Sequence, residues 1–403
     1  MNTVIENDRK AEALLQAARK LFPGASSQTY IDVASRGLIP ASAPQIAYEH
    51  LQQRVLGRAN KAAYFAVVEA ARDGIARLLN ARPDEIAITK NVSDGLNIIA
   101  NAIDWRAGDE VLVCPDIEHP NNLYTWRNLE SRGVTVRTLP SPNDELPVEA
   151  VRQVLEGKHR VRVLTVSGIS FIPGSRIDLD SLSELCRAHG VYLVVDGAQT
   201  VGIGHLDLEK TAVDALAMST QKGLCSVYGM GFLYVRQSLA QTLRPQSLAR
   251  FGVDIPATHE ADYDNGPIVF QQGARRFDLG NYNFLAATLV KDSLDILNRI
   301  GTAVIERHVT KLAQTLADGL SAMGTPVHQP QSGRRANMVC VRSRTGSAAA
   351  TALQAHLKSH GVQVALRRNT VRFSFHLYNN DADVAAALSA TEGWLERHGP
   401  TLG

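Results

Sequence analysis

The sequence predicts an α/β protein with helices on both faces of a mostly parallel sheet, followed by a smaller α+β lobe. Its 403 residues exceed the size at which a single core usually stops growing, so two domains, or one large domain with a smaller lobe, are expected. Apolar runs of strand length alternate with helical patterns over much of the chain, which is typical of a parallel sheet. A polar, glycine-containing stretch from 252 to 276 breaks this alternation and precedes the smaller lobe.

Six apolar runs predict strands of the larger domain, and the first leads into the helical pattern SDGLNIIANAI. In chain order they are EIAIT (85–89), EVLVC (110–114), VRVLTVS (161–167), VYLVVD (191–196), DALAMS (214–219) and GFLYV (231–235). Ligands gather at the carboxyl ends of strands in such sheets. Polar residues lie at or shortly after these ends, namely Ser93, His119, Ser167, Asp196 and Lys222. They are the first candidates for a binding site.

The smaller lobe is predicted from two helical patterns and three short strands. AATLVKDSLDILNRIG follows Phe284 and ends at Gly301, and VIERHVTKLAQTLADGLSAMG comes next. Strands are expected around NMVCVRS, VQVALR and VRFSFH. We therefore predict an N-terminal helical segment over 1–28 that packs with the small domain, a large domain over 29–283 and a small domain over 284–403.

Composition excludes several classes of function. Forty-two Lys and Arg against forty Asp and Glu, with no basic block, argue against nucleic-acid or membrane-surface binding and favour a small-molecule ligand. The N-terminus lacks a secretory signal, and the apolar runs are too short to span a bilayer. The four cysteines have no paired spacing, which predicts reduced thiols in the cytoplasm and no metal site. They are Cys114, Cys186, Cys225 and Cys340.

A carboxylate and a lysine close two of the predicted strands. Asp196 ends VYLVVD and is followed by Gln199, while Lys222 follows DALAMS in the run STQK. A pyridoxal phosphate (PLP) site needs such a pair, because the carboxylate keeps the pyridine nitrogen protonated and the lysine forms a Schiff base. Alone, Asp196 could be a turn or cap residue and Lys222 a solvated side chain. Together they favour PLP.

With further motifs in the same order, these residues resemble the class V aminotransferase family of fold type I PLP enzymes. That family includes cysteine desulfurases, selenocysteine lyases and isopenicillin N epimerase. The resemblance runs from YIDVASRGLIP near residue 30 to VRFSFHLYNN near residue 380. It implies a large domain with a mostly parallel seven-stranded sheet, a smaller α+β C-terminal domain and a homodimer with shared active sites.

The resemblance assigns cofactor-binding roles. Lys222 in STQK matches the Schiff-base lysine of an SxHK motif, whose other positions here are Ser219 and Gln221. Asp196 would pair with the pyridine nitrogen and Gln199 with the ring oxygen O3′. KNVSDGLNIIA resembles the phosphate-binding turn, in which the Val92 and Ser93 amides face the phosphate at a helix N-terminus. Ordinary N-capping by Ser93 or Asp94 would also explain this turn.

The resemblance also assigns a stacking residue and a substrate clamp. His119 in EHPNN matches the histidine that stacks on the cofactor ring and shuttles protons near the substrate. Arg372 in VRFSFHLYN matches the arginine that binds the substrate α-carboxylate through two parallel donors. Ala34 and Ser35 match the stretch that lies over this carboxylate. Arg367 and Arg368 are left as surface or substrate-side candidates.

The resemblance also implies one contact between the two subunits of the dimer. RFDLGN resembles an RFExGT segment that reaches the phosphate of the partner subunit, with Asn281 in place of the threonine. An amide can still donate to phosphate, so the shared site remains an expectation.

The chain departs from desulfurases at three places. GVQVALRRNTVRFS, from Gly361 to Ser374, holds no cysteine that could accept sulfur as a persulfide. Gln221 stands where the family usually has histidine, and it cannot exchange a proton at neutral pH. Gly168 replaces an asparagine, which favours the epimerase-like and uncharacterised branch. A persulfide-forming desulfurase is therefore not expected.

The predicted activity is that of a cytoplasmic PLP enzyme acting on an α-amino acid through an external aldimine and a Cα carbanion. A lyase that breaks a Cβ bond, of the C–S lyase kind, is favoured, and transamination or epimerisation of the same intermediate are the alternatives. A protein that kept the fold only for binding, without turnover, would be expected to have lost the lysine, the aspartate or the phosphate turn. The sequence retains all three.

Overall fold

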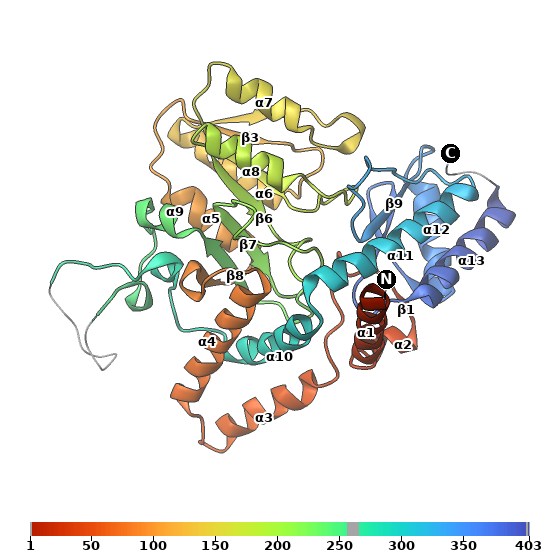
Figure 1. The fold of residues 1–403 in the computed structure, drawn as a ribbon, viewed down its shortest axis with the longest axis horizontal. Helices are drawn as coiled ribbons and strands as arrows, with labels where there is room; N and C mark the ends of the chain where they lie inside the picture. Colours follow the sequence, from red (N-terminus) through yellow and green to blue (C-terminus); the bar gives the residue numbers. More distant parts are fainter. Residues whose placement is uncertain (1, 256–265, 400–401, 403) are drawn as a thin grey trace.

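Within the described residues, seven strands form the central sheet, in the order β2-β8-β7-β6-β5-β3-β4 (Figure 1). The computed structural model describes residues 2–255, 266–399 and 402, so part of the polar stretch 252–276 lies outside the described residues. The strands are β2 (Ile86–Thr89), β3 (Glu110–Val113), β4 (Thr135–Thr138), β5 (Val161–Ser167), β6 (Tyr192–Asp196), β7 (Ala215–Ser219) and β8 (Gly231–Val235). β8 is antiparallel to β2 and β7, and the other neighbouring pairs are parallel. The predicted mostly parallel α/β fold is confirmed.

Each of the six apolar runs forms a strand, but β4 was not among the predicted strands. β4 pairs with β3 at the edge of the sheet, and its sequence TVRT is mostly exposed. An edge strand with little burial needs no apolar run, so hydrophobic patterning gives no signal for it.

Helices cover both faces of the sheet because successive strand residues point to opposite sides. Val163 and Val194 pack with α5, α6 and α9, whereas Leu164 and Leu193 pack in the core that includes α4, α7, α8 and α10. The helices are α3 (Ala43–Val55), α4 (Lys61–Leu78), α5 (Val92–Ala102), α6 (Asn121–Arg127), α7 (Val148–Glu156), α8 (Leu179–Ala188), α9 (Gln237–Thr242) and α10 (Phe284–Ile300). These two apolar layers hold the sheet rigid, and its carboxyl edge is left for polar side chains.

The C-terminal lobe contains an antiparallel sheet in the order β11-β12-β9. Its elements are α11 (Thr302–Ala322), β9 (Met338–Arg342), α12 (Ser347–Ser359), β10 (Val362–Gln363), β11 (Ala365–Arg367), β12 (Thr370–Ser374) and α13 (Asp381–His398). β1 (Thr29–Tyr30) pairs in parallel with β10, which joins the start of the chain to this lobe.

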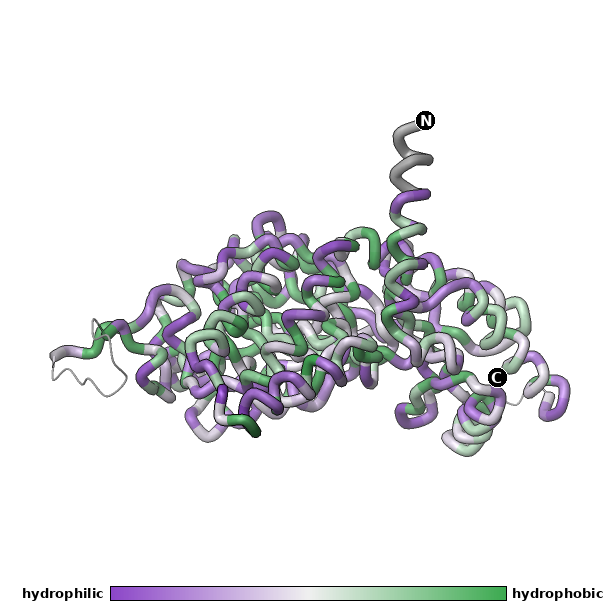
Figure 2. Tube along the Cα trace, turned by 90° about the horizontal axis from the view of Figure 1, so that it is seen from below, coloured by the Kyte–Doolittle hydropathy of each residue, from purple (hydrophilic) through white to green (hydrophobic). Residues whose placement is uncertain are grey.

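The N-terminal helices lie beside the C-terminal lobe (Figures 1 and 2). α1 (Asn2–Arg19) and α2 (Gly24–Ser27) precede β1, and Arg19 forms a 2.7 Å ion pair with Asp383 of α13. The predicted boundary between 283 and 284 falls at the N-cap of α10, which packs on α4 through Leu294 and Gly74. The domain boundaries remain a prediction. In the part of the chain that is described, no helix combines the length and apolar character needed to cross a membrane.

Candidate active site

A cavity of about 610 Å³ lies at the carboxyl ends of β5, β6 and β7. The predicted site residues that line it are Ala34, Ser35, Val92, Ser93, His119, Asp196, Gln199, Ser219, Gln221 and Lys222. Arg372 is buried beside the cavity and touches two of its lining residues, Ser35 and Phe171. Asn281 is exposed and does not line it. The fold therefore gathers all but one of the predicted residues at one place.

Lys222 and Asp196 face this cavity from adjacent strand ends. Asp196 ends β6 and accepts a hydrogen bond from the Ala198 amide at 2.9 Å. Burial raises the pKa of Asp196, and the Ala198 amide and the Lys222 charge oppose that rise. Burial lowers the pKa of Lys222 to about 8, although Asp196 acts against it. A buried carboxylate with so few hydrogen bonds favours a cationic partner, and a lysine with this pKa is partly neutral near pH 7.

The turn between β2 and α5 presents a helix N-terminus to the cavity. Asn91, and not Ser93 or Asp94, caps the helix, because its side-chain oxygen accepts the Asp94 amide at 2.9 Å. Asp94 instead accepts the Lys90 amide. The Ser93 hydroxyl is therefore not used for capping and accepts from Asn121 Nδ2 at 2.8 Å. First-turn amides, a helix dipole and a free hydroxyl are groups of the kind that bind phosphate in proteins.

Two further polar atoms make this cavity fit a bound cofactor. Within the described residues, Ser219 Oγ and Gln199 Oε1 are buried without a hydrogen-bond partner, although both residues line the cavity. Gln199 is held in place because its Nε2 donates to the Ala34 carbonyl at 3.1 Å. Buried polar atoms are rarely left unpaired, so these two indicate a polar ligand. The lysine, the carboxylate, the helix N-terminus and the two unpaired polar atoms together match the kinds of group that PLP requires.

His119 lies edge-on against Phe171, with ring centroids 4.7 Å apart and planes at 89°. Its Nδ1 accepts the Asn121 amide at 3.1 Å, which places the proton of the neutral ring on Nε2. Burial first, and then the charge of Lys222, lower the pKa of His119 below its usual 6.5. The imidazole is therefore neutral at pH 7 and offers one N–H donor.

Two arginines meet at Ser35 on the other side of the cavity. Ser35 Oγ accepts from Arg367 Nη2 at 2.9 Å and from Arg372 Nη2 at 3.4 Å. Arg372 also donates to the Phe171 carbonyl at 3.2 Å and lies over the Phe171 ring at 5.3 Å. Its Nε is buried without a partner in the described part of the chain. This guanidinium is placed to receive a carboxylate.

Comparison with known proteins agrees with this geometry. The family model "Aminotransferase class-V" matches residues 45–387. The chain belongs to the class V aminotransferase family. It is a PLP-dependent enzyme of that family, and the cavity described above contains the groups that would hold PLP.

Relatives within this family carry different names. An uncharacterized aminotransferase, YcbU of Bacillus subtilis, is 28% identical over 94% of this chain and 97% of its own length. A probable cysteine desulfurase of Methanothermobacter thermautotrophicus is 29% identical over 91% of this chain and 94% of its own length. Neither level of identity separates the two activities.

Solved structures share the fold. An apo cysteine desulfurase from Thermococcus onnurineus NA1 superposes with a TM-score of 0.84 at 23% identity, over 95% of this chain and 98% of its own. The cystine C–S lyase C-DES in complex with cysteine persulfide gives a TM-score of 0.81 at 23% identity, over 92% and 98%.

Sequence reasoning missed part of this class V site. Phe171, Tyr228 and Lys90 line the cavity but were not predicted to, and Arg367 was left between a surface and a substrate-side role. Phe171 lies in a loop after β5, and its place between His119 and Arg372 depends on two other chain segments. Spacing along the chain gives no signal for such a position.

No cysteine of the described chain lines the cavity of this class V enzyme. All four cysteines are free and buried, and burial raises the pKa of the Cys340 thiol to about 11. Thiols that cannot ionise near neutral pH are poor nucleophiles.

A buried carboxylate beneath the cavity, Glu118, was not predicted as part of the site. It accepts from the Ser167 amide at 2.6 Å, from the Ser167 hydroxyl at 2.5 Å and from Asn122 Nδ2 at 2.9 Å. Ser167 pairs with Asp196 in the sheet and both line the cavity, so this network holds the strand end beside Asp196. Burial raises the pKa of Glu118 to about 7 despite these three donors, and the charge of Asp196 raises it further.

Glu118→Gln should remove part of the pH dependence of stability in the cofactor-free protein. Between pH 4.5 and 7 folded Glu118 holds a proton that the unfolded chain has lost, so stability falls as pH rises through this window. This rise in the pKa of Glu118 corresponds to a loss of about 3 kcal/mol in the free energy of unfolding across the window. Urea unfolding from pH 4.5 to 8 measures the slope, with Glu149→Gln, an exposed change on α7, as the control. An unchanged slope in Glu118→Gln would contradict this assignment.

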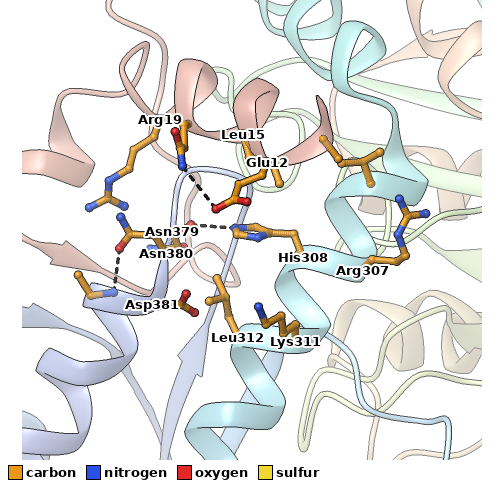
Figure 3. A pocket seen from close by; sticks show the side chains of 14 residues that line it. Glu12, Leu15, Arg19, Arg307, His308, Lys311, Leu312, Asn379, Asn380 and Asp381 are labelled. Carbon is orange, nitrogen blue, oxygen red and sulfur yellow. Dashed lines mark hydrogen bonds between the residues drawn. The ribbon is translucent and has the colours of Figure 1, made fainter. Parts of the chain in front are cut away.

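A second cavity, of about 620 Å³, lies between α1, α11 and the start of α13 (Figure 3). Its lining mixes basic residues such as Arg307 and Lys311 with acidic ones such as Glu12 and Asp381. His308 Nε2 is already engaged with the Asn379 carbonyl at 2.8 Å. None of the predicted catalytic residues lines this cavity. The predicted catalytic residues Lys222, His119 and Asp196 instead line the first cavity.

Proposed function

We propose that this enzyme is a lyase that breaks the Cβ–S bond of a sulfur-containing α-amino acid. The observation that carries the proposal is the cavity itself, which combines Lys222, Asp196 and the Arg372 clamp but has no cysteine among its described lining residues. A transpersulfidating enzyme needs such a cysteine, whereas an eliminating lyase does not. The naming of relatives as probable cysteine desulfurases supports chemistry on a sulfur amino acid.

Each residue of the proposed active site would have a separate role. Bound PLP supplies an electron sink conjugated to the substrate Cα. Asp196 would keep the pyridine nitrogen protonated, and the α5 N-terminus with Ser93 and Ser219 would hold the phosphate. Arg372 would hold the substrate carboxylate and so orient the bonds at the substrate Cα.

Proton transfer falls to Lys222 and His119. The Lys222 amine would take the α-proton, and its pKa of about 8 keeps a useful fraction neutral near pH 7. His119 would lie beside the cofactor and assist proton transfer from its Nε2–H, the nitrogen left free by the Asn121 amide. Gln221 lines the same cavity and acts as a hydrogen-bond donor to phosphate or substrate, since it cannot exchange a proton.

Aminotransfer is the second candidate, because the relative YcbU is named an aminotransferase and the same residues serve both outcomes. Epimerisation shares the same proton removal from Cα and is the remaining alternative.

Purified enzyme incubated with a panel of amino acids separates these reactions. Release of pyruvate and sulfur products from cysteine or cystine, without an added acceptor, is the expected result. Keto acid formed only with an added amino acceptor would show that the enzyme is an aminotransferase and not a lyase. Loss of optical activity without keto acid would show that it is an epimerase.

The active form is proposed to be a cytoplasmic homodimer with shared sites. Asn281 is exposed outside its own cavity, which suits a contact with the phosphate bound by a partner subunit. Tyr228 lines the cavity yet is 61% exposed, and Leu279, beside Asn281, is 45% exposed. A partner surface would cover such side chains. Sedimentation velocity tests the dimer, and a monomer at micromolar concentration contradicts it.

The proposed cytoplasmic location is supported by the four buried free thiols, which are compatible with a reducing compartment.

A further inference from the structure

The turn after Lys222 is held by three separate parts of the chain. The Gly37 amide donates to the Gln221 carbonyl at 2.8 Å, and Ser293 Oγ of α10 donates to the Cys225 carbonyl at 2.9 Å. The third contact comes from the C-terminal lobe, where His376 Nε2 lies 2.8 Å from the Gly223 carbonyl. Cys225 adopts a left-handed backbone with φ of 50°, which is unfavourable for a residue with a Cβ. Outside contacts are therefore needed to keep this turn in place.

The His376 ring is oriented to donate a hydrogen bond to this turn. Its Nδ1 accepts the Leu377 amide at 2.6 Å, so the proton of the neutral ring is on Nε2 and is donated to the Gly223 carbonyl. The His376 amide donates to Asn379 Oδ1 at 2.8 Å, and the ring stacks on Tyr378 with centroids 5.3 Å apart. His376 is fully buried, and burial lowers its pKa to about 4. The donor is therefore present throughout the physiological pH range.

His376 also belongs to the segment that carries the carboxylate clamp. Arg372 lies in β12, and His376 follows that strand by two residues. The Ser374 amide donates to the Ile31 carbonyl at 2.8 Å, which anchors the end of β12. One short stretch thus bears the guanidinium that meets the substrate carboxylate and the imidazole that meets the Lys222 turn.

Space at the contact is tight on the side of the turn. A Cβ on Gly223 would lie 2.2 Å from the Val201 carbonyl, so the backbone at 223 lies close against the turn that follows β6. A Cβ on Gly37 would lie 2.2 Å from the Lys222 carbonyl on another side. The turn is packed on these sides, and His376 supplies the hydrogen bond from the C-terminal lobe.

We propose that His376 is a positioning residue that keeps the Lys222 turn in register with Arg372. The hydrogen bond to Gly223 fixes the separation between the amine that attacks or deprotonates and the guanidinium that orients the carboxylate. Without it, the two halves of the site are each intact but are no longer aligned. Misalignment of about 1 Å between such groups is enough to lower the rate roughly 100-fold. The inference rests on the proposed function only in giving Lys222 and Arg372 their cofactor and carboxylate roles.

The test compares the affinity of PLP-loaded enzyme for glycine and for methylamine, which differ by the carboxylate, through the change in visible absorbance. The ratio of the two affinities reports alignment of the clamp with the lysine site. Arg372→Lys sets the scale for loss of the clamp. His376→Leu should lower the ratio roughly tenfold, because it removes the hydrogen bond from the C-terminal lobe and leaves the Gly223 carbonyl with the weaker 3.8 Å hydrogen bond from the Cys225 thiol. His376→Gln, which can place an amide donor near the Nε2 position, should keep it.

Ser293→Ala is the matched control. It removes a hydrogen bond to a carbonyl of the same turn, but from α10 and not from the C-terminal lobe. It should change both affinities alike and leave the ratio unchanged. Circular dichroism confirms folding of each variant, and His376→Asn, whose amide is too short to reach Gly223, serves if His376→Leu does not fold.

The outcomes are separable. A wild-type ratio in folded His376→Leu or His376→Asn overturns the inference, and so does an equal loss of the ratio in Ser293→Ala. Wild-type enzyme that shows no visible absorbance with PLP, or no preference for glycine, instead overturns the proposed function.

Discussion

Lys222→Ala should lower turnover by at least about 10⁴-fold and abolish covalent attachment of the cofactor. The change removes both the amine proposed to form the Schiff base and the base proposed to take the α-proton. The visible absorbance of wild-type enzyme should survive dialysis, whereas that of the variant should not. A small primary amine added to the variant should restore part of the activity, which would separate a missing base from a misfolded site.

Lys90→Ala is the matched control, because Lys90 is the other lysine that lines the cavity within the described residues. Borohydride reduction followed by peptide mapping should place the cofactor on Lys222 in both wild type and Lys90→Ala. Absorbance that persists in Lys222→Ala after dialysis contradicts the assignment. The rate at which cofactor-free enzyme takes up PLP should also rise with pH through about 8, since only the neutral Lys222 amine is nucleophilic.

Asp196→Asn should lower turnover by about 10³-fold while leaving the fold intact. In the proposed site its carboxylate is the charge that keeps the pyridine nitrogen protonated, and a neutral amide cannot replace that interaction. In the cofactor-free state the buried carboxylate has one hydrogen bond, from the Ala198 amide, so its neutral replacement should not reduce thermal stability. The Lys222 pKa should fall below about 8, because the Asp196 charge normally raises it.

Asp214→Asn provides the comparison for Asp196→Asn. Asp214 immediately precedes β7, accepts the Leu193 amide at 2.8 Å and pairs with Arg236, away from the cavity. Burial raises its pKa as it does for Asp196, but no cofactor role is assigned to it. Steady-state kinetics and uptake of PLP as a function of pH measure both variants. Equal losses of turnover in the two, or full turnover in Asp196→Asn, would contradict the role given to Asp196.

The core of this site could be predicted because its residues follow strands with strong apolar patterns. β6 and β7 are buried almost throughout, so their sequences show where they end, and Asp196 and Lys222 come at those ends. The phosphate turn follows β2 in the same way, although its cap is Asn91 and not either of the two residues considered. β4 was not predicted because this exposed edge strand has no run of apolar residues.

The sequence by itself determined the fold class, the family and the residues that follow the central strands, because strand periodicity and motif order are local properties of the chain. Only the tertiary structure decided how the lobes meet at the site. It placed Arg367 beside Arg372 at Ser35, set Phe171 against His119, and brought His376 to the turn after Lys222. These contacts join segments separated by up to 337 positions, as for Arg372 and Ser35. Such proximity comes from the packing of two layers and a lobe, which no local spacing encodes.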